Sequence, residues 1–267
     1  MDFKNCVRIM KKDWKLYLRN KEMLISMIIL PLMFSTVFPF IMIYSALIEP
    51  DEFIDAYGEF KELMNIPEHY NKYLVAASIA LRIFVLPYFL FTPSMISAII
   101  SADSFAGEKQ RKTMESLALL PISKNELILG KVLVAFIPSI LLSFIFFVFL
   151  GIEVNLIMLP YLDGNILIFT DITWLLTIFL LVPAITLFNI IIMVIISSRT
   201  KSFKGAQTIS GLLITPIIII MFMQTFNPAF LSAIMIIIIS LIMIGICVLL
   251  VKIGKKCINI EKLIIMS

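Results

Sequence analysis

Long apolar runs constrain the fold of this chain more than any other feature. About 20 apolar residues, at 1.5 Å each, cross the ~30 Å hydrocarbon core of a bilayer as an α-helix. Only 15% of the residues are charged, against about 25% in soluble domains. We therefore expect an all-α integral membrane protein with six transmembrane helices, forming a single domain over residues 1–267. The expected spans are 23–47, 83–102, 132–152, 172–196, 209–226 and 229–251.

Two span boundaries leave alternatives open. The second run can begin as early as Leu74, which would place Arg82 inside the span and not at its edge. The fifth and sixth runs are nearly continuous, and one helix over 209–251 would be about 65 Å long, twice the hydrocarbon core. We expect a turn at Asn227-Pro228, because proline interrupts helices, with a short re-entrant segment as the alternative.

The distribution of basic residues predicts the orientation. Of the 22 Lys and Arg residues, 19 fall in the alternate segments 1–22, 103–131, 197–206 and 252–267, whereas the intervening segments hold two. Basic loops stay on the cytoplasmic side, so we expect a multi-pass protein of the plasma membrane with both termini, including a tail over 252–267, in the cytoplasm. The net charge of +4 therefore reflects topology and does not indicate a nucleic-acid partner.

The first 22 residues have the pattern of an amphipathic helix. Trp14 and other apolar residues recur at spacings of three and four, which places them on one face. Basic residues surround that face and suit anionic lipid headgroups. We expect an interfacial helix over 1–22, lying on membrane lipids. Its apolar face would be Phe3, Val7, Met10, Trp14 and Leu18.

Chemistry inside the spans is sparse. No GxxxxGK[ST] phosphate loop occurs, the only histidine is His69, and no pair of acids lies in an apolar run. We therefore expect no catalytic residues, no metal site and no directly bound cofactor. Arg82 is the one ionisable candidate for a transport path, with an interfacial anchor as its alternative, and Asn189 is a polar candidate.

Two external segments have no clear chemistry. Seven acids lie in 48–73, where they form either a cation-attracting vestibule or, as we favour, an ordinary solvated loop. The second outer segment, 153–171, holds three acids and no Lys or Arg.

The charged segment 103–131 separates spans 1–2 (residues 23–102) from spans 3–6 (residues 132–251). Ser123 and Glu126 have the spacing of a capping box ahead of the third span. Thr113 can cap a short helix over 114–120, which is too short to be stable alone and should dock on another surface.

The order of residues in this segment, GEKQRKTMESLALLPISKNELILGK, resembles the intracellular loop of the ABC-2 (type-2 ABC exporter) permeases. Lys112 departs from the family's pattern, in which a Gly often precedes the Thr. The matching residues are Glu108, Lys109, Arg111, Thr113, Glu115, Ser116, Leu117, Pro121, Ile122, Ser123, Glu126, Leu127, Gly130 and Lys131.

The resemblance implies a function and partners. In this family the loop is a cytoplasmic coupling helix that docks in a groove of a separate ABC ATPase, which hydrolyses the ATP. The chain would thus be the permease subunit of an ATP-driven exporter, working with an ATPase subunit and a second permease copy or homologue as a dimer. The alternatives are a membrane-embedded hydrolase and an ion-gradient-driven transporter. The residues expected at the ATPase interface are Glu108, Arg111, Thr113, Glu115, Leu117 and Pro121.

Overall fold

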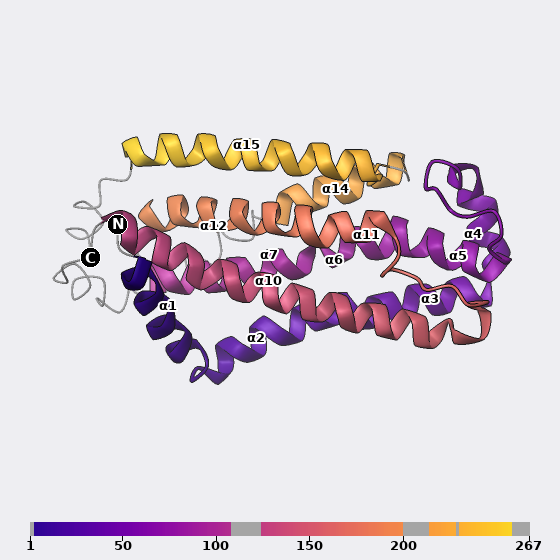
Figure 1. Ribbon diagram of the computed structural model, residues 1–267, viewed down its shortest axis with the longest axis horizontal. Helices are drawn as coiled ribbons and strands as arrows, with labels where there is room; N and C mark the ends of the chain where they lie inside the picture. Colours follow the sequence, from indigo (N-terminus) through magenta and orange to yellow (C-terminus); the bar gives the residue numbers. More distant parts are fainter. Residues whose placement is uncertain (1–2, 108–123, 200–213, 228–229, 258–267) are drawn as a thin grey trace.

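The computed structural model describes residues 3–107, 124–199, 214–227 and 230–257, and no strand occurs among them. The long helices run along one axis of an elongated bundle (Figure 1). The π-helical turns are η1 (Met33–Val37), η3 (Leu81–Val85), η4 (Asp103–Gly107) and η6 (Thr177–Leu181), and the 3₁₀ turns are η2 (Gly58–Phe60) and η5 (Leu159–Tyr161). The α-helices are α1 (Phe3–Tyr17), α2 (Lys21–Leu32), α3 (Phe38–Ile48), α4 (Pro50–Tyr57), α5 (Lys72–Ala80), α6 (Leu86–Phe89), α7 (Phe91–Ala102), α10 (Lys124–Ile157), α11 (Ile172–Leu176), α12 (Val182–Arg199), α14 (Thr215–Phe226) and α15 (Ala233–Cys257).

The all-α membrane fold is confirmed, while the number of spans is settled only in part. Five described helical segments are long and apolar enough to cross a membrane: Leu24–Ile48, Lys72–Ala102, Ile128–Ile157, Ile172–Ile196 and Ala233–Lys252. The fifth predicted run appears as α14, whose 12 residues measure about 18 Å. Residues 200–213, which precede it, lie outside the described part of the chain. The sixth span therefore remains a prediction.

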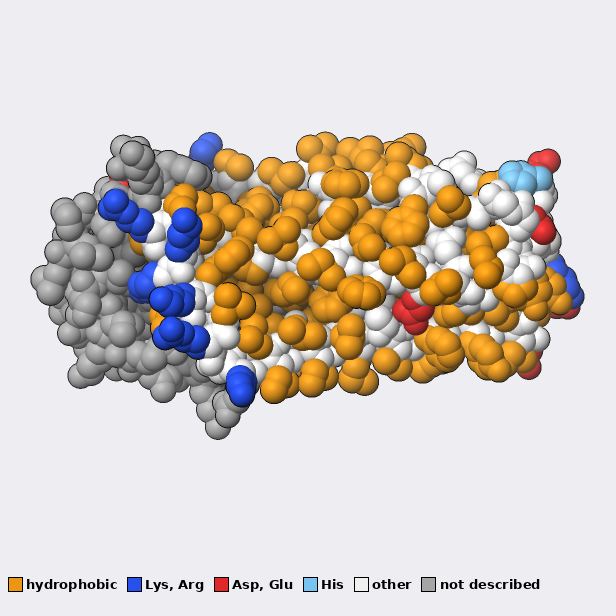
Figure 2. All heavy atoms as spheres, turned by 60° about the horizontal axis from the view of Figure 1, so that its bottom comes forward, with side chains coloured by type: hydrophobic (Ala, Val, Ile, Leu, Met, Phe, Trp, Pro, Cys, Tyr) orange, Lys and Arg blue, Asp and Glu red, His pale blue; other side chains and the backbone are white. Residues whose placement is uncertain are grey.

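The second span is the centre of the bundle. Its most apolar stretch is 78% buried within the protein, whereas the corresponding stretches of the first and last spans are 22% buried. Its α7 segment packs against α2, α10 and α12. The first and last spans therefore turn much of their surface outward, and Figure 2 shows a broad hydrophobic band across the middle of the face that it draws.

Two helices begin or end outside their predicted limits. The second span starts at Lys72, where the Asn71 side chain accepts a hydrogen bond from the Leu74 amide and caps the helix. The third span continues to Ile157, so Glu153 belongs to helix α10 and not to the outer loop. Continuing a helix past the apolar core keeps the backbone groups hydrogen-bonded at the boundary, which hydropathy alone does not register.

Prolines explain three of the four π-helical turns. Pro39, Pro87 and Pro183 each follow a π-helical turn by two residues, so the carbonyl four residues before each proline lies in the middle of that turn. In an α-helix the proline ring clashes with this carbonyl and cannot donate to it. The wider turn relieves the clash, because the amide before each proline reaches back five residues. These bonds run from Phe38 to Met33, from Leu86 to Leu81 and from Val182 to Thr177.

Helix α1 packs on α10 through a face beside the apolar stripe that the sequence assigns to lipid. Among residues 6–17, its buried residues are Cys6, Ile9, Asp13 and Tyr17, which recur at spacings of three and four. Met10 and Trp14 are partly buried, and Leu18 lies beyond the helix and is exposed. Contact of α1 with lipid remains a prediction.

A glycine and a tryptophan fix the contact between α1 and α10. A Cβ at Gly130 would lie 3.1 Å from the Ile9 Cβ, so only glycine allows this approach without displacement of α1. The Trp14 indole N–H donates to the Val134 carbonyl at 3.3 Å. That carbonyl lies four residues before Pro138, which has no N–H to give it. The indole thus replaces the missing backbone donor.

The first outer segment forms a folded cap. Phe53 and Tyr57 of α4 meet the ring of Phe84 edge to face. Met64 and Ile66 pack on α5 in a small apolar cluster of their own. The seven acids of this segment are all exposed, as expected of a solvated surface. The cap lies at the opposite end of the bundle from α1 and the end of α15 (Figure 1).

A pair of glycine substitutions tests this packing. Gly151 of α10 faces the ring of Phe169, and an added Cβ would collide with the ring. We expect Gly151→Ala to destabilise the protein by about 1–3 kcal/mol through overpacking. Gly245 of α15 has open space at its Cβ position. There we expect alanine to be neutral or to stabilise the protein by up to about 1 kcal/mol through helix propensity. Apparent melting temperatures in detergent would measure both, and equal shifts would contradict the packing.

Candidate functional site: the outer pocket at Arg82

Arg82 forms an ion pair between two spans. Its Nη2 and Nε lie 2.8 Å and 2.9 Å from the same carboxylate oxygen, Oδ2 of Asp171. The two side chains are only 15% and 19% exposed, so water screens the pair less than it would at an open surface. Arg82 belongs to the π-helical turn η3 of the second span, and Asp171 precedes the fourth span.

Asp171 also caps the helix that it precedes. Its Oδ1 accepts a hydrogen bond from the Thr173 amide at 2.8 Å, which is the N-cap arrangement. The two oxygens of one carboxylate therefore hold the start of α11 and the Arg82 guanidinium. This places Arg82 level with the first residues of the fourth span, ten residues into its own helix.

The backbone of Arg82 is bonded to helix α14. The Leu86 amide donates to Leu81, and Pro87 has no N–H, so the π-helical turn leaves the Arg82 carbonyl without a donor from its own helix. Gln224 of α14 supplies one, with its Nε2 3.3 Å from the Arg82 oxygen. The Oε1 of Gln224 accepts the Leu231 amide at 3.0 Å, beyond the break after α14.

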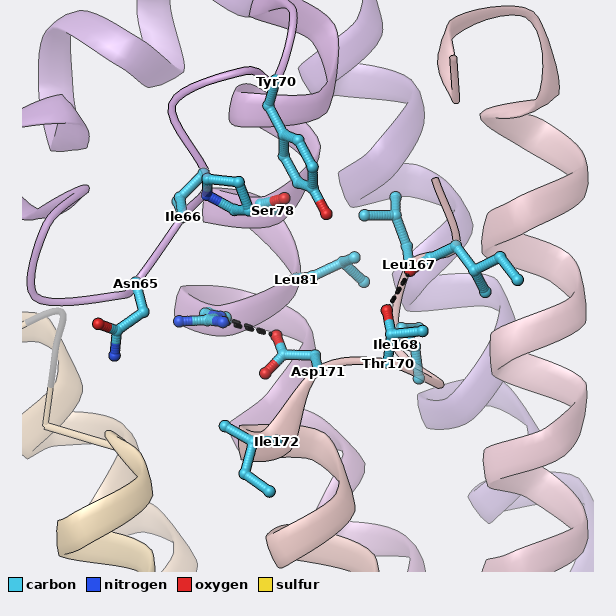
Figure 3. A pocket seen from close by; sticks show the side chains of 13 residues that line it. Asn65, Ile66, Tyr70, Ser78, Leu81, Leu167, Ile168, Thr170, Asp171 and Ile172 are labelled. Carbon is cyan, nitrogen blue, oxygen red and sulfur yellow. Dashed lines mark hydrogen bonds and ion pairs between the residues drawn. The ribbon is translucent and has the colours of Figure 1, made fainter. Parts of the chain in front are cut away.

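A pocket of about 210 Å³ lies beside this junction. Figure 3 shows the Tyr70 hydroxyl pointing into the pocket. Asp171 holds the Arg82 guanidinium at the edge of the same space. The lining mixes polar side chains with apolar ones from both outer segments. It consists of Asn65, Ile66, Pro67, Tyr70, Ser78, Leu81, Arg82, Ile166, Leu167, Ile168, Thr170, Asp171 and Ile172.

The charges of the ion pair reach Tyr70. The pKa of Tyr70 is raised, chiefly because the phenol is partly buried and also because the negative charge of Asp171 disfavours a phenolate. The positive charge of Arg82 lowers this pKa, but by less. Tyr70 therefore remains a neutral phenol with a proton to donate. Its hydroxyl makes no hydrogen bond to another described residue.

Asparagine side chains hold the second outer segment in place. The Nδ2 of Asn155 donates to the carbonyls of Gly151 and Leu167, and its Oδ1 accepts the Leu167 amide. Asn71 donates to the Tyr161 carbonyl and to Asp163. Asn155 thus fixes the pocket wall of residues 166–172 to α10 through the backbone of Leu167. Asn71 fixes the preceding residues, Tyr161 and Asp163, to the start of α5.

Asn189, the other predicted path residue, lies elsewhere. It is buried in α12 with its Nδ2 3.4 Å from the Ser97 hydroxyl of α7, and no described residue pairs with its Oδ1. Ser97 follows Arg82 by 15 residues, or about 22 Å of helix. The structure therefore does not bring Arg82 and Asn189 into one site. It places Asn189 in a helix contact, and neither residue is shown to line a transport path.

The expected ATPase interface falls outside the described residues. This applies to Glu108, Arg111, Thr113, Glu115, Leu117 and Pro121. The elements on either side of this segment, η4 and α10, are described and are in contact. Buried Lys131 of α10 donates through Nζ to the Ser104 carbonyl in η4. The Gly130-Lys131 step of the motif therefore contacts α1 on one side and the end of the second span on the other.

Sequence reasoning missed the role of Asp171. We assigned it to an outer loop as one of three acids, although its place directly before Ile172-Thr173 is a typical N-cap signal. The role of Gln224 was missed as well. Gln224 bonds to another helix, whereas Thr186 and Ser139, which are also polar residues within apolar runs, donate to carbonyls of their own helices. Hydropathy does not distinguish these two outcomes.

Comparisons with known proteins address the family directly. A family model described as ABC-2 family transporter protein matches residues 7–248, which covers most of the chain. A search of curated proteins and a search of solved structures each found no match. The match includes all five candidate spans apart from the last residues of α15. The resemblance read from the charged segment 107–131 is thus confirmed: the chain is a multi-pass membrane protein of the ABC-2 transporter family.

Proposed function

We propose that this chain is the membrane-spanning permease subunit of an ATP-driven exporter and works with a separate ABC ATPase. The observation that carries the proposal is the family match over residues 7–248. These 267 residues contain no GxxxxGK[ST] phosphate loop, so a nucleotide site would come from a partner. ATP would then be hydrolysed by that partner, with no cofactor bound directly by this chain.

The geometry around residues 108–123 supports a coupling role for that segment. Lys131 connects its two ends, because α10 and η4 are the elements that flank it. Helix α1 packs on the same end of α10. A force applied to the segment would therefore act on the second span, the third span and α1 together. We propose that a helix over 114–120 docks on the ATPase, and that two permease copies or homologues assemble into one exporter.

We propose that α1 and the end of α15 face the cytoplasm. Exposed Lys and Arg gather at the α1 end, and Asp and Glu appear at the other end beyond the hydrophobic band (Figure 2). This asymmetry favours a cytoplasmic position for the basic end. A single cysteine at position 115 in a cysteine-free variant should react with an impermeant maleimide only after the cells are permeabilised. Reaction in intact cells would overturn the orientation.

A charge reversal tests coupling to the ATPase. Glu115→Arg should weaken binding of the ATPase and reduce ATP-dependent export, because a reversed charge in a docked interface costs more than the ~0–1 kcal/mol of an exposed pair. Glu62→Arg makes the same charge change on an exposed residue of the outer cap and serves as the control. Co-purification of the ATPase and ATPase stimulation are the measurements.

The two variants should differ in ATPase binding and not in stability. Both should express and melt like the wild type, and only Glu115→Arg should lose the ATPase. Wild-type co-purification of the ATPase by Glu115→Arg, with normal export, would contradict docking at this segment.

A further inference from the structure

The outer pocket has more hydrogen-bond donors than the protein uses. A guanidinium has five N–H bonds, and Arg82 directs Nε–H and one Nη2–H at Asp171. Asp171 is the one acceptor of that side chain among the described residues. The other three N–H bonds of Arg82 are therefore available on the side away from Asp171.

Two hydroxyl groups add to these donors. Ser78 lines the pocket and is 8% exposed, and its hydroxyl has no hydrogen-bond partner in the described residues. The Tyr70 hydroxyl also has no hydrogen-bond partner in the described residues, and it stays protonated. Both hydroxyls line the pocket, so each can donate to an acceptor that enters it. Ser78, Tyr70 and Arg82 thus form a cluster of donors in which Asp171 is the one acceptor used by the described residues.

Apart from Asn65 and Thr170, the rest of the lining is apolar. Ile66, Leu81 and Ile172 border the pocket from the cap, the second span and the fourth span, and 166–168 closes another side. A small inorganic anion would satisfy the donors but leave these surfaces exposed to water. An anion joined to an alkyl or acyl group would satisfy both.

We propose that this pocket binds the carboxylate or phosphate of an amphiphilic anion, with the apolar part of the ligand against Ile66, Leu81 and Ile172. The anion accepts hydrogen bonds from Arg82, Tyr70 and Ser78. A lipid headgroup and a soluble amphiphile share this chemistry. Binding of this anion does not depend on the proposed permease function. Transport of the anion as cargo would rest on that function.

Asp171 competes with such a ligand. The ligand anion and the Asp171 carboxylate are like charges on one guanidinium, so each weakens the hold of the other. Occupancy would therefore loosen the link from Arg82 to the fourth span, while the Gln224 bond to the Arg82 carbonyl is not in competition. The negative charge of Asp171 therefore opposes binding of the anion, an effect that a purely structural partner of Arg82 would not have.

The test uses dodecyl phosphate as the probe. It is titrated by calorimetry into the purified full chain in dodecyl maltoside, a neutral detergent, and we expect saturable binding. Asp171→Asn keeps an N-cap acceptor and removes the negative charge, so the probe should bind about tenfold more tightly. Tyr70→Phe removes one donor and should weaken binding about tenfold.

Matched controls separate the pocket from the general surface. Tyr73→Phe removes a phenol whose ring packs on Tyr161 outside the pocket, and Lys72→Gln removes an exposed cation paired with Asp51. Both should bind the probe like the wild type. Arg82→Gln should abolish saturable binding, and if that variant folds poorly, Asp171→Asn and Tyr70→Phe still decide the question.

Two further arms identify the source of the anion. Inhibition of probe binding in nanodiscs of phosphatidylcholine with phosphatidylglycerol, but not in phosphatidylcholine alone, would support a lipid headgroup. Equal binding in both nanodiscs would support a soluble amphiphile. Absence of saturable binding, unchanged affinity in Asp171→Asn, or wild-type affinity in Tyr70→Phe would each overturn the proposal. None of these results would affect co-purification of the ATPase, so the permease proposal is tested separately.

Discussion

Two prolines within the spans leave backbone carbonyls without donors, and each of these carbonyls is satisfied by a side chain that makes a contact between helices. In a bilayer no water can replace a missing backbone donor, so a partner must come from the protein. Pro138 frees the Val134 carbonyl, and the Trp14 indole binds it. Pro87 and its π-helical turn free the Arg82 carbonyl, and Gln224 binds it. Each proline therefore selects a side chain from a distant segment.

These two contacts lie toward opposite ends of the bundle, and each holds together the helices at its own end. At the α1 end, the indole bond holds α1 on α10, close to where Lys131 connects the third span with the end of the second. At the other end, Arg82 joins its own span to the fourth span through its side chain and Asp171, and to α14 through its backbone and Gln224. The buried second span extends from the Lys131 contact at one end to Arg82 near the other, so it connects the two ends.

The sequence predicts the class of the protein well and the site poorly, for physical reasons. Apolar length and the order of residues in the loop at 107–131 are local properties, and they were enough for the membrane fold and the family. Arg82 stood out because a charge near an apolar run is rare. Its partners did not, because Asp171 and Gln224 are 89 and 142 residues away along the chain. The π-helical turn that frees the Arg82 carbonyl depends on tertiary packing as well as on Pro87.

A double-mutant cycle between Pro87 and Gln224 tests the central claim most directly. Pro87→Ala restores a backbone N–H, so the Arg82 carbonyl no longer needs Gln224. Unfolding free energies would be measured for the two single variants and the double variant, with Met223→Leu on the exposed face of α14 as the control. We expect Gln224→Leu to cost about 1–3 kcal/mol in the wild type and measurably less in the Pro87→Ala background. The same cost in both backgrounds would contradict the account.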